Sequence, residues 1–231
     1  MVIKGVVFDF NGTLVRDGHL HNIAWLEFLK KYRIPLGDPK AAESLHGRTN
    51  HEILNLIFSR QLSADEAAVL GEEKEAFYRR LCIETRHELM PGAVELFHWL
   101  KNNNIPSTIA TASDKENVDF YFEFFPLNQF FERQKVVYND GSFPGKPHPG
   151  LFLEAIRRLD IPANQILIFE DSANGILAAE RAGCGKIVVV DSHHQDYSAW
   201  NYPKIETFND LDYHLFAQNL SNKRKSAGSS R

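Results

Sequence analysis

Five short apolar runs constrain the fold of this 231-residue chain more than any other feature of its sequence. The runs are rich in β-branched residues and occupy positions 2–8, 107–110, 135–138, 166–169 and 187–190. They do not alternate polar with apolar residues, which is typical of strands buried on both faces of a parallel sheet. Helical patterns separate them at 93–102, 115–124, 149–159 and 173–182. The sequence therefore predicts an α/β fold, with a Rossmann-like parallel sheet core flanked by helices.

The pattern changes between residues 18 and 87, where no convincing strand interrupts the helical stretches. These stretches lie at 21–32, 51–58 and 64–81. We predict that residues 18–87 form a helical insertion after the first strand. Residues 1–17 and 88–217 would then form the α/β core. The polar, Ser/Gly-rich residues 218–231 are expected to be disordered.

The composition argues against several classes of partner. A net charge of −4 gives no basic excess that would attract nucleic acid. No apolar stretch approaches the roughly 20 residues of a membrane span, and residues 1–10 do not resemble a signal peptide. Cys82 and Cys184 lie far apart in no metal-ligand spacing, which is typical of reduced thiols. We therefore expect a cytoplasmic protein with no nucleic-acid or membrane partner, and we favour a monomer.

Chemically active side chains follow four of the predicted strands. Asp9, Thr111 and the pair Glu170-Asp171 come directly after apolar runs, and Lys146 lies in the loop after another run. Because the carboxyl ends of parallel strands meet at one edge of a sheet, we expect these side chains to converge there. The combination fits phosphoryl transfer, in which a nucleophile approaches a dianion and charge must be neutralised from several sides.

The acids have two predicted roles, nucleophilic attack and metal binding. Asp9 is the predicted nucleophile and would form an aspartyl phosphate. Mg²⁺ is the predicted cofactor because it takes hard oxygen ligands. Its predicted ligands are Asp9, Asp171, Glu170 and the main-chain carbonyl of Asn11.

The phosphate itself needs cationic and hydrogen-bonding partners. Lys146 would offset the repulsion between Asp9 and the incoming dianion. Thr111 and the loop amides around Asn11 and Gly12 would bind the phosphate oxygens. The predicted substrate is therefore a small phosphorylated metabolite.

Four motifs, "DFNGTL", "ATAS", "GKPHPGLF" and "FEDSANGI", resemble in sequence and order those of the haloacid dehalogenase-like superfamily. The resemblance spans residues 3–190 and implies the same roles for the acids, threonine and lysine named above. The helical insertion at 18–87 resembles the small helical cap domain of the branch that contains β-phosphoglucomutase and phosphoglycolate phosphatase, so the resemblance implies that this insertion is a cap. Within it, "LHGRTNHEIL" at residues 45–54 is similar to the cap loop that faces the active site.

Five further residues are candidate substrate contacts: Gly12, Thr13, Ser113, Arg48 and His21. The first three belong to the motifs. Arg48, in the cap loop, is also compatible with a solvated surface group. His21 opens a helical stretch of the cap and is equally suited to a structural hydrogen bond.

Residue 11 departs from the family pattern. Most phosphatases and mutases of the family carry there an aspartate that acts as general acid and base, whereas the amide of Asn11 cannot exchange a proton near neutral pH. We therefore expect a Mg²⁺-dependent phosphomonoester hydrolase that Asn11 attenuates. The alternatives are a sugar-phosphate mutase and a catalytically silent binder of a phosphorylated ligand. A mutase is disfavoured because Asp114 and Asn50 stand where the resemblance implies the lysine and arginine that hold a second phosphate.

Overall fold

The computed structural model describes residues 2–35, 48–192 and 194–216 of the chain. Its strands form one parallel sheet with the order β2-β1-β3-β4-β5. The strands are β1 (Gly5–Phe8), β2 (Ser107–Ile109), β3 (Ile166–Glu170), β4 (Lys186–Val190) and β5 (Lys204–Ile205). The interior position of β1, between β2 and β3, agrees with its sequence, because all four of its residues are buried and none is charged. The predicted α/β fold is confirmed.

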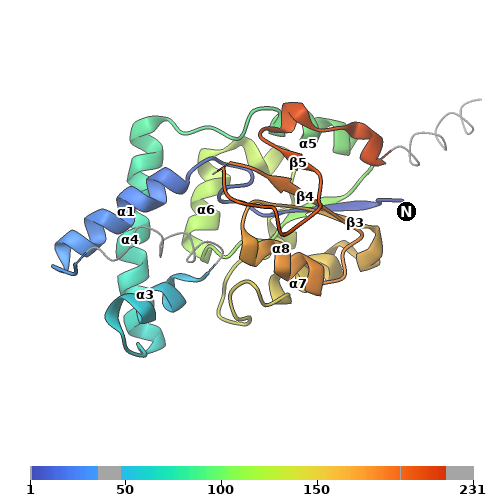
Figure 1. The fold of residues 1–231 in the computed structure, drawn as a ribbon. Helices are drawn as coiled ribbons and strands as arrows, with labels where there is room; N and C mark the ends of the chain where they lie inside the picture. The colour runs from blue at the N-terminus through green and yellow to red at the C-terminus, as the bar shows by residue number, and fades with distance from the viewer. Residues whose placement is uncertain (1, 36–47, 193, 217–231) are drawn as a thin grey trace, which may run out of the picture.

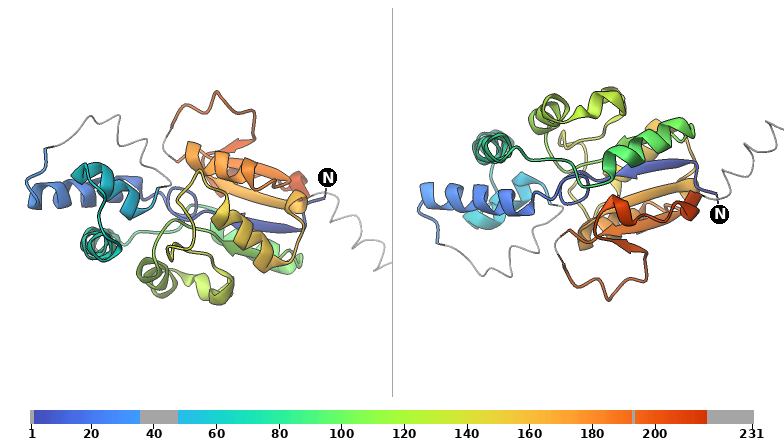
Figure 2. Two further views of the ribbon diagram at one scale, coloured as in Figure 1. Left: turned by 90° about the horizontal axis from the view of Figure 1, so that it is seen from below. Right: turned by 90° about the horizontal axis from the view of Figure 1, so that it is seen from above.

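Helices cover both faces of the sheet (Figure 2). On one face lie α5 (Ala93–Asn102) and α6 (Lys115–Phe124), and on the other lie α7 (Gly150–Leu159) and α8 (Ala173–Arg181). Because side chains alternate along a strand, Val6 and Phe8 join the core under α5 and α6, whereas Val7 joins the core under α7 and α8.

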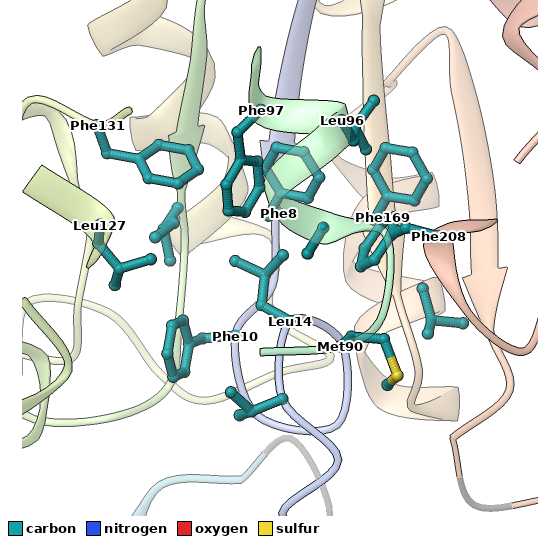
Figure 3. Packing of buried hydrophobic residues seen from close by; sticks show 14 of the residues in the cluster. Phe8, Phe10, Leu14, Met90, Leu96, Phe97, Leu127, Phe131, Phe169 and Phe208 are labelled. Carbon is teal, nitrogen blue, oxygen red and sulfur yellow. The ribbon is translucent and has the colours of Figure 1, made fainter. Parts of the chain in front are cut away.

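Phenylalanine rings fix the carboxyl end of β1 (Figure 3). The Phe8 ring stacks on Phe169 of β3 at a centroid distance of 5.1 Å. The edges of Phe97 and Phe131 meet the same ring, with centroids at 5.5 and 6.0 Å. Fully buried aromatic pairs contribute roughly 0.5–1.5 kcal/mol beyond their area burial. This cluster therefore holds in place the residue that follows Phe8, which is Asp9.

The helical insertion is confirmed as a cap beside the sheet (Figure 1). Its helices are α1 (Gly18–Lys31), α3 (Asn50–Phe58) and α4 (Ala64–Thr85). Capping boxes start two of them: Thr49 with Glu52 begins α3, and Ser63 with Glu66 begins α4. A separate hydrophobic cluster built around Phe28 holds the cap together.

Two segments differ from the expected strands. The run at 135–138 pairs with the sheet only through a bridge between Val137 and Ala110. A 3₁₀ turn at Arg133–Lys135 precedes this bridge, and turn-forming residues at 139–142 follow it, so too little extended chain remains for a strand. By contrast, β5 is a strand that no apolar run predicted, because only two residues pair.

The remaining short elements are 3₁₀ helices at Pro126–Gln129, Ala163–Gln165, Phe208–Asp210 and Tyr213–Phe216. None of the helices within the described ranges is long and apolar enough to cross a membrane. The tail at 218–231, for which disorder was expected, lies outside the described residues.

Candidate active site

Three buried acids meet at the carboxyl end of the sheet. Asp9 follows β1, Glu170 ends β3, and Asp171 comes next in the chain. The pairing of Phe8 with Phe169 sets these chain ends side by side. One oxygen from each carboxyl lies within 4.8 Å of the others. The predicted convergence of these acids is therefore present in the structure.

Lys146 reaches this group from the loop before α7. Its Nζ donates to Asp9 Oδ1 at 2.6 Å and also to Glu170 Oε1. The lysine is only 2% exposed, and its ammonium lies 4.8 Å from the centre of the Phe152 ring. Burial lowers the pKa of Lys146, but the charges of Asp9 and Glu170 outweigh this effect and raise it above its usual range. Lys146 is therefore a fixed positive charge beside Asp9.

The charges at this site do not balance. Burial and the charge of Glu170 raise the pKa of Asp9 to about 7, although Lys146 opposes them. Burial and both neighbouring carboxylates raise the pKa of Asp171 well above its usual range. The Lys146 ammonium pairs with Asp9 and Glu170, so ionisation of all three carboxyls would leave two negative charges uncompensated within this group. A divalent cation with a preference for oxygen ligands fits both this charge and this donor set.

The loop after β1 packs closely against the acids. Gly12 has a φ of 80°, and a Cβ at this position would overlap Asp171 Oδ2. Only glycine fits both the left-handed backbone and the close approach. Thr13 Oγ1 donates to Asp171 Oδ1 at 3.0 Å, so Thr13 holds a predicted metal ligand in place.

Two residues of the "ATAS" motif lie beside the loop. Thr111 follows β2 and is buried, and its Oγ1 accepts a hydrogen bond from Ser113 N at 3.1 Å. Ser113 Oγ in turn donates to Asn11 Oδ1 at 2.8 Å. The structure thus joins Ser113 to Asn11, and the contact of Ser113 with substrate stays a prediction.

The Asn11 amide lies in a buried polar network that sequence reasoning missed. Asn11 Nδ2 donates to Asp17 Oδ2 at 2.7 Å and to Tyr121 OH at 2.9 Å. Asp17 also accepts from Tyr78 OH at 2.5 Å and from Gly12 N at 3.0 Å. Burial raises the pKa of Asp17, but His21 first, and then the hydrogen bonds from Tyr78 and Asn11, outweigh burial and lower it to about 2. An ionised Asp17 therefore lies beside residue 11, where the amide of Asn11 can donate to it.

The cap closes this network from the other side. His21 Nε2 lies 3.2 Å from Asn11 Nδ2, and the His21 ring stacks on Tyr78. Lys74 Nζ lies 2.7 Å from His21 Nδ1. His21 therefore reaches residue 11, while Lys74 had no sequence motif to mark it.

A second link joins cap and core near Lys146. Glu52 Oε1, in the first turn of α3, accepts from Gly145 N at 3.2 Å. A Cβ at Gly145 would overlap the Glu52 carboxylate, so glycine permits this contact. Arg48 is half-buried just before α3, and its contact with substrate stays a prediction. Of the cap loop at 45–54, residues 45–47 lie outside the described chain.

Comparisons with known proteins agree with this geometry. The family model for haloacid dehalogenase-like hydrolases matches residues 3–183. The chain is 31% identical over 218 residues to (DL)-glycerol-3-phosphatase 2 of Arabidopsis thaliana, with 84% of each protein covered. It is 28% identical over 187 residues to the β-phosphoglucomutase of Bacillus subtilis, with 78% of this chain and 80% of the relative covered.

The fold comparison gives the same relationship. A crystal structure of a HAD hydrolase of family IA, variant 3, from Entamoeba histolytica has a TM-score of 0.84 and 33% sequence identity. The similarity covers 95% of this chain and 100% of that one, so it includes the cap as well as the sheet.

The contact between Asn11 and Asp17 can be tested through stability. Asn11→Asp removes a donor from buried Asp17 and sets two carboxylates beside each other, so we expect a loss of roughly 1–3 kcal/mol in unfolding free energy at pH 7. In the variant, repulsion raises the pKa of one of the two carboxyls in the folded state above its value in the unfolded state. The full loss of stability is therefore present at pH values above this folded-state pKa. It should shrink as the pH falls toward about 4, where unfolded carboxyls protonate.

Urea denaturation at pH 7.5 and pH 5 measures both effects. The exposed Asn201→Asp variant makes the same chemical change and should unfold like the wild type. An Asn11→Asp variant as stable as the wild type at both pH values would contradict the proposed contact.

Proposed function

We propose that this chain, which belongs to the haloacid dehalogenase-like hydrolase family, is a phosphatase that hydrolyses small phosphorylated metabolites through an aspartyl phosphate at Asp9. The observation that carries the proposal is the buried Asp9 carboxylate, with Lys146 Nζ at 2.6 Å and two further acids against it. Such an arrangement suits attack on a dianion because the ammonium offsets repulsion while the nucleophile stays fixed.

The reaction proceeds in two displacements. Asp9 Oδ attacks phosphorus and the ester oxygen leaves, so one P–O bond forms as another breaks. Water then attacks the phosphorus of the aspartyl phosphate, releases inorganic phosphate and regenerates the Asp9 carboxylate. Lys146, Thr111 and the amides of the Gly12 loop hold the phosphoryl oxygens during both steps.

Asp9, Glu170, Asp171 and the carbonyl of Asn11 would hold Mg²⁺. The cation would neutralise charge on the transferring group and lower the pKa of Asp9, which keeps that carboxylate ionised. Thr13 contributes by orienting Asp171 through its hydroxyl. The unbalanced pair of negative charges at the acids supports this assignment.

Asn11 changes how protons move in both displacements. An amide neither protonates a departing alkoxide nor activates water, and losing such catalysis typically costs about 10²–10⁴-fold in rate. Positioning and electrostatics supply most of the catalysis in phosphoryl transfer, so turnover should persist at a reduced rate. The silent binder is the second candidate, and Asn11 is the observation that favours it.

The mutase alternative needs a cationic pocket for a second phosphate. Where the resemblance implies a lysine for that phosphate, this chain has Asp114, the N-cap residue of α6. Glu75 lies near enough to Asp114 for its charge to raise the pKa of Asp114. Two acids would repel a second phosphate, so we favour the hydrolase over the mutase.

The metal assignment predicts the effect of removing one acid. Asp171→Asn keeps the shape of the side chain but removes a charged ligand, so Mg²⁺ affinity measured by calorimetry should fall by at least about tenfold. The exposed Asp196→Asn variant is the matched control and should bind like the wild type. Unchanged affinity in Asp171→Asn would remove this residue from the ligand set.

The loss of the acid at residue 11 predicts a kinetic signature. With p-nitrophenyl phosphate the leaving group needs little protonation, so a burst of p-nitrophenolate should precede slow steady turnover. Asn11→Asp combined with Asp17→Asn places a carboxyl at residue 11 without setting it against a second carboxylate. This double variant should raise steady-state phosphate release, by up to about 10²–10⁴-fold on alkyl phosphates. The single Asn11→Asp variant should gain less.

Two controls complete this experiment. Mass spectrometry of the wild type must exclude deamidation at the Asn11-Gly12 pair, because a trace of aspartate would mimic native activity. If neither variant changes turnover of any ester while Asp9→Ala abolishes ligand binding, the silent binder replaces the hydrolase.

A further inference from the structure

A buried carboxylate oxygen of the cap has no hydrogen-bond partner among the described residues. Glu75 of α4 is only 3% exposed, and its Oε1 accepts from Lys74 Nζ and Asn50 Nδ2, each at 2.8 Å. Its second oxygen, Oε2, has no hydrogen-bond partner within the described parts of the chain. Buried polar atoms normally have partners, so an exception next to a binding site calls for an explanation.

The carboxylate of Glu75 is ionised. Burial raises its pKa, but the charge of Lys74 and the nearby His21 outweigh burial and lower the pKa to about 2. Asn117 of α6 also interacts with this carboxylate and lowers its pKa. Oε2 is nevertheless a charged acceptor for which no described residue provides a donor at standard hydrogen-bond geometry.

The surroundings of Glu75 connect it to the site described above. Its partner Lys74 also contacts His21, whose other ring nitrogen lies 3.2 Å from Asn11 Nδ2. Asp114 approaches from α6, and burial together with the Glu75 charge raises the pKa of Asp114 to about 6. Asp114 directly follows Ser113, which donates to Asn11 Oδ1. Glu75 thus lies where cap residues meet residue 11 of the core.

The charges around Glu75 select against an anionic substrate group. Lys74 is already held by Glu75 and His21, and it lies 5.0 Å from the centre of the Trp25 ring. A second phosphate or a carboxylate placed here would face Glu75 and Asp114, and like charges brought together at an interface cost several kcal/mol. A hydroxyl group would instead supply the missing donor.

We propose that Glu75 determines specificity by accepting a hydroxyl hydrogen from the substrate's leaving group through Oε2. The substrate is then the phosphate ester of an uncharged polyol, and esters that carry a second anionic group are rejected. This inference rests on the proposed phosphatase function, and it assigns to Glu75 a contact with the leaving group of the substrate.

Three esters with the same carbon skeleton test this contact. n-Propyl phosphate lacks a hydroxyl on the leaving group, glycerol 3-phosphate carries two, and 3-phosphoglycerate carries a carboxylate. In the wild type, kcat/KM should be at least about tenfold higher for glycerol 3-phosphate than for n-propyl phosphate. The value for 3-phosphoglycerate should be the lowest.

Two variants locate the effect. In Glu75→Gln, the amide oxygen can keep the contacts with Lys74 and Asn50, so the NH₂ group replaces Oε2 and turns an acceptor into a donor. The ratio of kcat/KM for 3-phosphoglycerate to that for glycerol 3-phosphate should rise about tenfold or more. Asp114→Asn keeps an N-cap side chain and should raise the same ratio by a smaller factor. Glu84→Gln makes the same change at an exposed position of α4 and should leave the ratio unchanged.

The same esters are also titrated by calorimetry into the Asp9→Asn protein, which keeps the pocket but lacks the nucleophile. If the wild type releases phosphate from all three esters without preference, and neither Glu75→Gln nor Asp114→Asn moves the ratio, the role of Glu75 is overturned. If the wild type releases no phosphate while the Asp9→Asn affinities follow the predicted order, the hydrolase proposal fails and the contact of Glu75 stands. If the Asp9→Asn protein binds no ester and the wild type turns over none, both proposals fail.

Discussion

The ion pair between Lys146 and Asp9 is the contact on which the site depends, because it places an ammonium against the proposed nucleophile inside a closely packed protein. A buried charge needs a partner held in good geometry. Close packing at several positions around the pair provides this geometry. The Phe8 cluster fixes β1, and Gly12 lets its loop approach Asp171. Gly175 does the same for Glu170, since a Cβ there would overlap the carboxylate. The site is therefore built into the packing of the sheet.

Residue 11 links this charged centre to the cap. In this chain its amide donates to Asp17, and Tyr78 of α4 donates to the same carboxylate. Asn11 thus belongs to a network that holds cap and core together, whereas the family resemblance describes residue 11 only as a proton carrier. Substituting it should alter cap placement as well as chemistry, which is why stability and turnover are both informative.

Sequence patterns predicted the parts of the structure that depend on neighbouring residues in the sequence. Buried strands and amphipathic helices carry periodic signals, and the acids at strand ends follow from parallel topology. The run at 135–138 was mispredicted because an apolar run does not show how many of its residues find a partner strand. The contact between Asp17 and Tyr78 had no such signal, because the two residues are 61 positions apart in the sequence. Only the docking of cap on core brings them together.

The central claim is that Asp9 carries the phosphoryl group during turnover. Wild-type protein is mixed with p-nitrophenyl phosphate and Mg²⁺, quenched during the burst and treated with borohydride. The borohydride reduces an aspartyl phosphate to homoserine. Peptide mass spectrometry should then find homoserine at position 9, and the Asp9→Asn protein should show none. Phosphate release without modification at position 9, or with modification at another acid, would contradict the account.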